Sequence, residues 1–333
     1  MKKNIYFLGL LLLAACANDD EPTGQQVQNT YPLTIEVTEN PLIPDGEEGS
    51  STRAAIVDNS TLNKFYMSYG YSGNATYSNM EADKSTEGKW TTTTGSWPGA
   101  GVDTEVTWYA SSVSLSNQST GNAFYPNGGN PYINFIVEES ATNQKDLLVA
   151  TASGTYSGTG GKLTFNFNHA CAALRFWIKK STNMSGYKLE IKEVVLCNVV
   201  NEAKYYYASG WGDLYSTRSV YTLFSSASNR TLDSADYIAM DGGTPNYLFM
   251  IPQALTAWDT RTAIASATTQ SYLKVKCTVT DTSKEPNTVV HNDAYAYIPF
   301  GATLAAGKKY DVKINIGKNS LYSGPDTKII PAS

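Results

Sequence analysis

Charged side chains are scarce in this chain, and so is histidine. Asp, Glu, Lys and Arg together make up 17% of the 333 residues, against roughly 25% in an average soluble domain. The formal net charge is −5, so the sequence offers no basic surface of the kind that nucleic-acid binding requires. The two histidines are His169 and His291, which argues against a multi-histidine metal centre and against a pair of histidine bases.

Recognisable catalytic patterns are also missing. No serine lies in a nucleophile elbow, and the adjacent acidic pairs at residues 19–20 and 138–139 would point to opposite faces of an extended chain. Residues 158–163 (GTGGKL) lack the spacing and the Ser/Thr of a phosphate-binding loop. Because no nucleophile, base and orienting group can be assembled, we expect a protein that is not an enzyme and that holds no cofactor and no metal.

Cysteine is sparse as well, with four in the chain. Cys16 belongs to the N-terminal segment, and the odd number that remains (Cys171, Cys197 and Cys277) argues against a disulfide framework. Two interpretations stay open. Cys171 and Cys197 lie in neighbouring strand-like runs and could pair, or all three are buried small apolar side chains, which is the simpler reading.

The longest apolar run stands at the start of the chain. It covers residues 5–13 after two lysines, about half of what spans a bilayer. Residues 13–16 (LAAC) then place small side chains before a cysteine, as in a lipobox. The sequence therefore predicts a lipoprotein signal peptide over residues 1–15, an acyl anchor on Cys16 and a linker over residues 16–30. An ordinary cleaved signal with a chance cysteine is the alternative.

The rest of the chain alternates short apolar runs with spacers rich in Gly, Asn, Ser and Pro, the pattern of strands and turns. No long segment has a helical period. About a dozen strands exceed the seven to nine of one sandwich, so we expect an all-β protein with two β-sandwich domains. The expected strands are residues 33–38, 65–71, 106–110, 132–138, 146–151, 163–178, 189–200, 205–207, 247–251, 272–280, 295–300 and 310–316.

We place the N-terminal sandwich at residues 31–175 and the C-terminal sandwich at residues 176–333. The glycine-rich run at residues 154–161 is the strongest candidate for a flexible stretch near this border. The long strand expected after it either ends the first domain or begins the second.

Two kinds of side chain in these strands invite a functional interpretation. His169 shares a strand face with two phenylalanines, which predicts a hydrogen-bonded histidine in the core or between domains. His291 lies next to an expected hairpin turn, and we expect it to be exposed. Residues 205–207 (three tyrosines) with Trp211 could stack on sugar rings, although packing around a turn explains them better.

Several segments, in order along the chain, resemble the fimbrillins, the pilin subunits of Bacteroidales fimbriae (the type V pilus, with its FimA- and Mfa-like families). The segments are the lipobox cysteine, residues 52–54 (TRA), 165–176 (FNFNHACAALRF), 248–253 (LFMIPQ) and 307–314 (GKKYDVKI). The resemblance implies that both expected domains are transthyretin-like β-sandwiches. It also implies a place at the outer membrane and cell surface, in a fimbrium, with other fimbrial subunits as partners.

The resemblance further implies a route of assembly. Fimbrillins travel as lipoproteins, are cut after an arginine by an arginine-specific protease, and lose their first strand. A strand from a neighbouring subunit then fills the groove, pairing with the open sheet edge. Carried onto this sequence, the cut falls between Arg53 and Ala54, after the lipid on Cys16 has held the precursor in the outer membrane.

Two sequence features fit this processing. Arg53 is the first arginine of the chain and lies in a Gly- and Ser-containing stretch that is suited to proteolysis. The strand to be removed, within residues 31–53, has Leu33, Ile35 and Val37 on one face, as a groove-filling strand requires. A loop arginine that is never cut, with a first strand that stays, is the alternative.

The C-terminal segment departs from the family pattern. Major shaft fimbrillins carry a donor stretch after the strand that corresponds to residues 310–316, and residues 317–333 are short for that task. We therefore expect a subunit that accepts a strand but donates poorly, as at a fimbrial tip, where it would bind a host or bacterial surface ligand. A shaft role stays open. So do a non-polymerising surface lipoprotein that binds glycan or host protein, and a carbohydrate-active enzyme or its accessory module.

Overall fold

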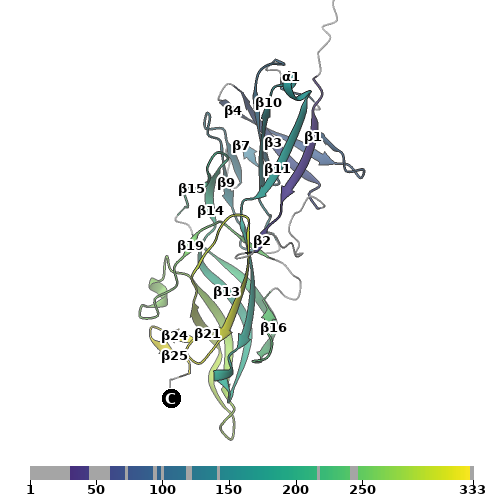
Figure 1. Cartoon of the computed structure of the whole chain (residues 1–333). Coiled ribbons are helices and arrows are strands. Elements are labelled where there is room, and N and C mark those ends of the chain that lie inside the picture. Colours follow the sequence, from purple (N-terminus) through teal and green to yellow (C-terminus); the bar gives the residue numbers. More distant parts are fainter. Residues whose placement is uncertain are drawn as a thin grey trace, which may run out of the picture.

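The computed structural model describes residues 31–44, 61–71, 74–92, 96–98, 101–117, 122–140, 143–215, 218–240 and 247–330. Cys16, Arg53 and Ala54 lie outside the described residues. Within them the protein is built from strands in several sheets, with one short α-helix, so the expected all-β class is confirmed. No helix among these residues is long and apolar enough to cross a membrane. The molecule is elongated, with the first strands at one end and the C-terminus at the other (Figure 1).

Seven strands close into a barrel in the order β1-β11-β10-β6-β3-β4-β5. β1 runs parallel to β11, whereas the other described pairings of the barrel are antiparallel. The barrel strands are β1 (Thr34–Asn40), β3 (Lys64–Tyr71), β4 (Asn74–Lys84), β5 (Trp90–Thr92), β6 (Val106–Ser111), β10 (Leu148–Gly154) and β11 (Lys162–His169).

Two sheets form the other end of the molecule. The first, in the order β17-β12-β23-β2 with β18 beside β12, contains β2 (Ile43–Pro44), β12 (Ala172–Lys180), β17 (Ile238–Ala239), β18 (Leu248–Met250) and β23 (Lys308–Ile316). The second, in the order β16-β13-β20-β21-β24-β25, contains β13 (Tyr187–Val200), β16 (Arg218–Leu232), β20 (Tyr272–Asp281), β21 (Thr288–Pro299), β24 (Tyr322–Gly324) and β25 (Thr327–Lys328).

A further sheet joins segments that are distant in sequence. Its order is β15-β14-β9-β8-β7, with β7 (Ser116–Asn117), β8 (Ala123–Tyr125), β9 (Tyr132–Ile136), β14 (Glu202–Tyr206) and β15 (Gly210–Gly212). The short strands β19 (Ala254–Leu255) and β22 (Ala302–Thr303) form a separate pair. This five-stranded sheet therefore takes strands from both sides of residue 175. The domain border that we place there stays a prediction.

Buried apolar side chains fall into two clusters. The smaller one fills the barrel around Phe65, Trp108 and Phe165. The larger one fills the sheets below it. Ile35 on β1 belongs to the barrel cluster, while Leu42, seven residues later in the same segment, belongs to the other cluster. Residues 31–44 therefore contribute to both cores.

The expected strand at residues 163–178 is wrong as a single element. β11 ends at His169 and β12 begins at Ala172 in a different sheet. The change of sheet falls in a run of small apolar residues without Gly or Pro, so no turn signal marks it. The glycine-rich run before β11 is not a plain loop either, since it contains α1 (Tyr156–Thr159), with Thr155 capping its first turn and Gly160 ending it at a φ of 62°.

The three cysteines of the body are free and buried, so Cys171 and Cys197 do not pair, and the interpretation as buried small side chains is confirmed. His291 lies inside β21 and is half-buried, so the expectation of an exposed turn residue is wrong.

Candidate functional site

β1 is held in the barrel almost entirely by one neighbouring strand, β11. Seven consecutive residues, Thr34–Asn40, pair with Lys162–Asn168 of β11. On its other side β1 meets β5 through the single pair of Ile35 and Trp90. Its main partner lies 128 residues away in the sequence, so this strand is held by side chains and ladder bonds and not by a hairpin turn. Figure 1 shows β1 beside β11 along the barrel wall.

The inner face of β1 carries the apolar residues that the sequence predicts. Ile35 is 5% exposed and lies opposite Leu163, and Val37 lies opposite Phe165. Leu33 and Val37 are half-buried against the barrel cluster. Beneath them the rings of Phe65 and Phe165 meet edge to face at 5.5 Å. The structure thus brings Leu33, Ile35 and Val37 together on the inner side of one strand, and β1 covers part of an aromatic core.

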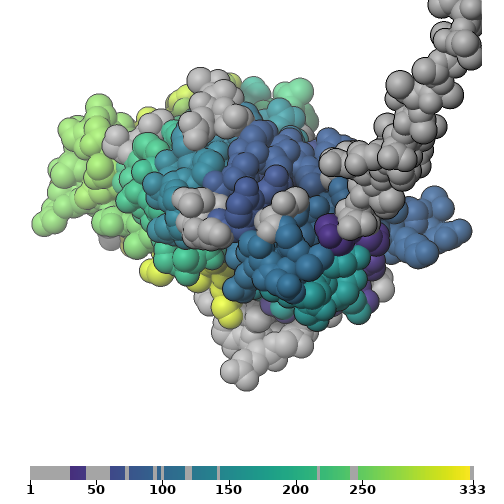
Figure 2. All heavy atoms as spheres, turned by 90° about the horizontal axis from the view of Figure 1, so that it is seen from above, coloured from purple at the N-terminus to yellow at the C-terminus, as the bar shows by residue number. Residues whose placement is uncertain are grey.

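The outer face of β1 is polar and open to solvent. Glu36 forms an ion pair of 2.7 Å with Lys162, and both side chains are about half exposed. Asn40 donates from Nδ2 to Oδ1 of Asn168 at 2.7 Å. Figure 2 shows the purple atoms of this segment at the surface beside teal atoms of the α1–β11 region. Exposed pairs of this kind contribute little to stability, so the inner face holds the strand.

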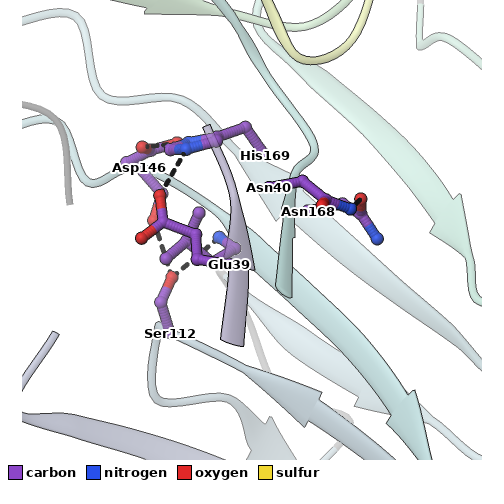
Figure 3. Close-up of polar contacts among 7 residues, drawn as sticks. Glu39, Asn40, Ser112, Asp146, Asn168 and His169 are labelled. Carbon is purple, nitrogen blue, oxygen red and sulfur yellow. Dashed lines mark hydrogen bonds and ion pairs between the residues drawn. The ribbon is translucent and has the colours of Figure 1, made fainter. Parts of the chain in front are cut away.

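One inward position of β1 is not apolar. Glu39 lies opposite Phe167 on the inner face, and its Oε1 lies 2.9 Å from Nε2 of His169. The other ring nitrogen of His169, Nδ1, lies 2.7 Å from Oδ2 of Asp146. The side chains of His169, Glu39 and Asp146 are 1%, 6% and 1% exposed. Figure 3 shows the three converging, and we call them the buried ionic cluster.

The remaining contacts of Asp146 fix its position. The hydroxyl of Ser112, just after β6, donates to the backbone carbonyl of Asp146 at 2.6 Å and accepts from the backbone N–H of Leu148 at 2.9 Å. The backbone N–H of Ala170 donates to the carbonyl of Leu147 at 2.8 Å. The ends of β6 and β11 therefore hold Asp146 beside His169, whereas Glu39 alone reaches the cluster from β1 (Figure 3).

The electrostatics of the cluster favour a protonated histidine. Burial lowers the pKa of His169, but the hydrogen bonds and charges of Asp146 and Glu39 outweigh it and raise that pKa to about 9. Burial raises the pKa of Asp146, and the hydrogen bond from His169 opposes this rise. At neutral pH both ring N–H groups of the imidazolium therefore donate, Nδ1–H to Asp146 and Nε2–H to Glu39. The predicted hydrogen-bonded core histidine is confirmed.

The cluster has no catalytic equipment. It contains no nucleophile, its side chains are almost fully buried, and each carboxylate pairs with one ring nitrogen of His169, while Oδ1 of Asp146 is buried without a hydrogen-bond partner. No group of three or more His, Cys, Asp or Glu side chains suited to a metal ion occurs in the part of the chain that the structure describes. What the arrangement does is bind a carboxylate of β1 to the rest of the barrel.

The segment continues beyond β1 into the second core. Leu42 is 5% exposed, and β2 then pairs in parallel with Lys308 and Lys309 of β23. Residues 34–44 therefore lie along two sheets in one pass. The segment that carries Arg53 follows β2 in sequence, so Arg53 stands between this two-part strand and β3.

The aromatic candidates contact protein and one another. The rings of Tyr205 and Trp211 meet at 5.3 Å and pack against the larger core. Tyr207 donates to the carbonyl of Ala110 at 3.2 Å. Tyr206 contacts Tyr132 at 5.2 Å between ring centroids. Packing accounts for this group.

Comparison with known proteins gives one family. The family model described as Fimbrillin-like matches residues 52–330, which is most of the chain. No curated protein matches it.

Solved structures resemble the chain at low sequence identity. A fimbrial protein from Bacteroides vulgatus is 16% identical, with 86% of this chain and 95% of that chain covered and a TM-score of 0.54. A candidate cell adhesion protein from Bacteroides ovatus is 15% identical, with 91% and 99% covered and a TM-score of 0.46. One from Parabacteroides distasonis is 11% identical, with 89% and 91% covered and a TM-score of 0.48. The similarity to the Bacteroides vulgatus protein is a similarity of fold.

Proposed function

Since this chain belongs to the fimbrillin-like family of structural adhesion proteins, which are not enzymes, we propose that it is an adhesive subunit of a cell-surface fimbria. In this proposal the precursor is anchored in the outer membrane through lipid on Cys16. A protease then cuts between Arg53 and Ala54, and the strand of a neighbouring subunit takes the place of β1.

The observation that carries the proposal is the way β1 is held. The strand fills a gap between β11 and β5, pairs with β11 over seven residues and covers the barrel core with Ile35 and Val37. The chain returns from β2 to β3 through the residues that include Arg53. A cut there leaves the strand attached by non-covalent contacts alone.

The cut changes the competition for the groove. While the chain is intact, the tethered β1 has a high effective concentration at its own site, and an incoming strand competes poorly. After the cut, β1 binds as a separate chain with a hydrophobic contribution of about 1.5–3 kcal/mol for a buried Ile and less for a half-buried Val. A longer or better-matched strand from a second subunit can then displace it and restore the same ladder.

The segment after β23 favours a subunit that receives a strand and does not give one. Leu321 is 0% exposed and Ile330 is 2% exposed, both in the larger core. β24 pairs with β21 through Tyr322 and Tyr297. A donor segment has to leave its own domain. Here its departure would remove Leu321 and Ile330 from the larger core and leave a cavity there. This supports a place at or near a fimbrial tip.

N-terminal sequencing of the protein on the native cell surface tests the proposal. We expect a mature start at Ala54. The variant Arg53→Ala should keep residues 16–53 and fail to enter fimbriae, while the control Arg261→Ala, whose side chain is 77% exposed, should be processed normally. A start at lipidated Cys16 on surface-exposed wild-type protein would contradict the proposal and favour a non-polymerising surface lipoprotein.

A further inference from the structure

The buried ionic cluster joins the strand that the proposed cut removes to the body that remains. His169 and Asp146 belong to the body that remains after a cut at Arg53, whereas Glu39 belongs to the strand that is removed. The only charged side chain on the inner face of β1 within Thr34–Asn40 is therefore the one that binds the imidazolium.

Removal of β1 leaves one buried hydrogen-bond donor of the groove without its acceptor. Asp146 still balances the charge of His169, but the Nε2–H of His169 loses its acceptor. An incoming apolar side chain at this position would bury a charged donor without a partner, which costs more than burying a neutral unsatisfied group. A lysine or arginine would place a second cation against the imidazolium.

We propose that the His169–Asp146 pair is a recognition site for a carboxylate on the incoming strand. The partner is then an extended segment, parallel to β11, with apolar residues at the positions of Ile35 and Val37 and a Glu or Asp at the position of Glu39. This inference rests on the proposed strand exchange and names the chemistry of the strand that takes part in it.

The site also sets register. Side chains alternate between faces along a strand, so a slip of one residue moves every inward group outward. Apolar positions alone tolerate a slip of two residues, because one apolar side chain then replaces another. The carboxylate does not, since only one position of the strand lies opposite Phe167 and within reach of Nε2 of His169.

Among the residues that the structure describes, His169 has no ionic partner besides Asp146 and Glu39. The charged groups that act on it are Asp146, from the segment before β10, and Glu39, from β1. The neutral thiol of Cys171 is buried close to Asp146. The acceptor for Nε2–H therefore has to come with the strand.

Peptide exchange into the cut protein tests the inference. The full chain is prepared with a specific protease site beside Arg53, cut, and separated from its N-terminal fragment. The remaining body is titrated with fluorescent peptides of residues 31–44, and binding is followed by anisotropy. The peptides carry the wild-type sequence, Glu39→Gln, or the matched control Glu36→Gln, which removes an equal charge on the exposed face. We expect Glu39→Gln to bind at least about tenfold more weakly, because the amide oxygen of Gln accepts the bond from Nε2–H without the negative charge that pairs with the imidazolium. Glu36→Gln should stay within about twofold.

The outcomes separate the two proposals. Equal affinities of the wild-type and Glu39→Gln peptides would overturn the carboxylate site and leave strand exchange standing. Failure of the wild-type peptide to bind the cut protein would overturn strand exchange, and the carboxylate site with it. Both of these comparisons use the same unsubstituted body, so a folding defect cannot imitate either result. A His169→Gln body should also erase the difference between the two peptides.

Discussion

At the scale of the residue, β1 is held in part by the buried ionic cluster. Ion pairs buried in a core often add little net stability, because desolvation offsets the attraction between the charges. Breaking one partner, however, leaves an uncompensated buried group and costs several kcal/mol. The cluster therefore adds little stability compared with an apolar pair, but a strand without the carboxylate is strongly disfavoured, so Glu39 selects which strand, in which register, is accepted.

The pKa of His169 makes the hold on β1 depend on pH. His169 binds a proton with a pKa of about 9 in the folded protein and about 6.5 when unfolded. Its contribution is complete below pH 6.5 and is lost as the pH rises through 9. We expect the free energy of unfolding of the intact chain to fall by about 2–3 kcal/mol over that range, measured by urea denaturation at a series of pH values.

The slope of this profile assigns the effect to the cluster. Glu39→Gln removes one of the two carboxylates that raise the pKa of His169, so the fall with pH should become shallower. Glu36→Gln should leave the profile unchanged. A profile that is flat between pH 6.5 and 9 in the wild-type chain would show that His169 is not protonated in the fold.

At the scale of the element, β1 is an amphipathic strand, with one face toward the barrel core and the other toward solvent. Ile35 faces a core of aromatic rings, and Thr38 on the opposite face bonds to Asn166 at the surface. The two faces therefore predict opposite responses to the same substitution.

Aspartate at an inward position should loosen the strand. Ile35→Asp buries an unpaired carboxylate, and we expect it to destabilise the closed barrel by about 3 kcal/mol or more. Thr38→Asp should stay within about 0.5 kcal/mol. Hydrogen exchange at the amides of Thr34–Asn40 measures both, and equal protection in the two variants would contradict the assigned faces of β1.

Much of this element could be predicted from sequence, and its most specific contact could not. The alternation of Leu33, Ile35 and Val37 predicts a half-buried strand, and the same period places Glu39 on the apolar face. That last step was a usable signal, because an acidic side chain in an apolar row requires a partner. Which partner it has follows from a contact across 130 residues, and no local pattern encodes such a distance.

The missed strands have a different cause. β4 and the second half of β16 are rich in Ser, Asn and charged residues, so their composition is that of turns. Their strand conformation comes from pairing with β3 and β13, which overrides local propensity.

At the scale of the whole molecule, the C-terminal segment tests the place of the subunit in the fibre. If residues 317–330 are part of the larger core, Leu321→Asp should destabilise the protein by about 3 kcal/mol or more, because it buries a charge at a fully buried site. Ser323→Asp, at an exposed site of β24, should be neutral. Thermal unfolding measures both. Equal thermal stability of the two variants would mean that residues 317–330 are not needed for the stability of their own domain. It would favour a role of this segment as a donor strand.

The parallel pairing of β1 with β11 has a mechanical consequence. Both strands run along the barrel wall at one end of an elongated molecule (Figure 1), so tension along a filament would pull a strand seated there lengthwise against its neighbour. Under that load the ladder bonds of all seven register pairs are sheared together, instead of opening one after another as in peeling. With a carboxylate at position 39 bound to His169, sliding of the strand would also have to break this buried ion pair, so such a joint would resist lengthwise tension.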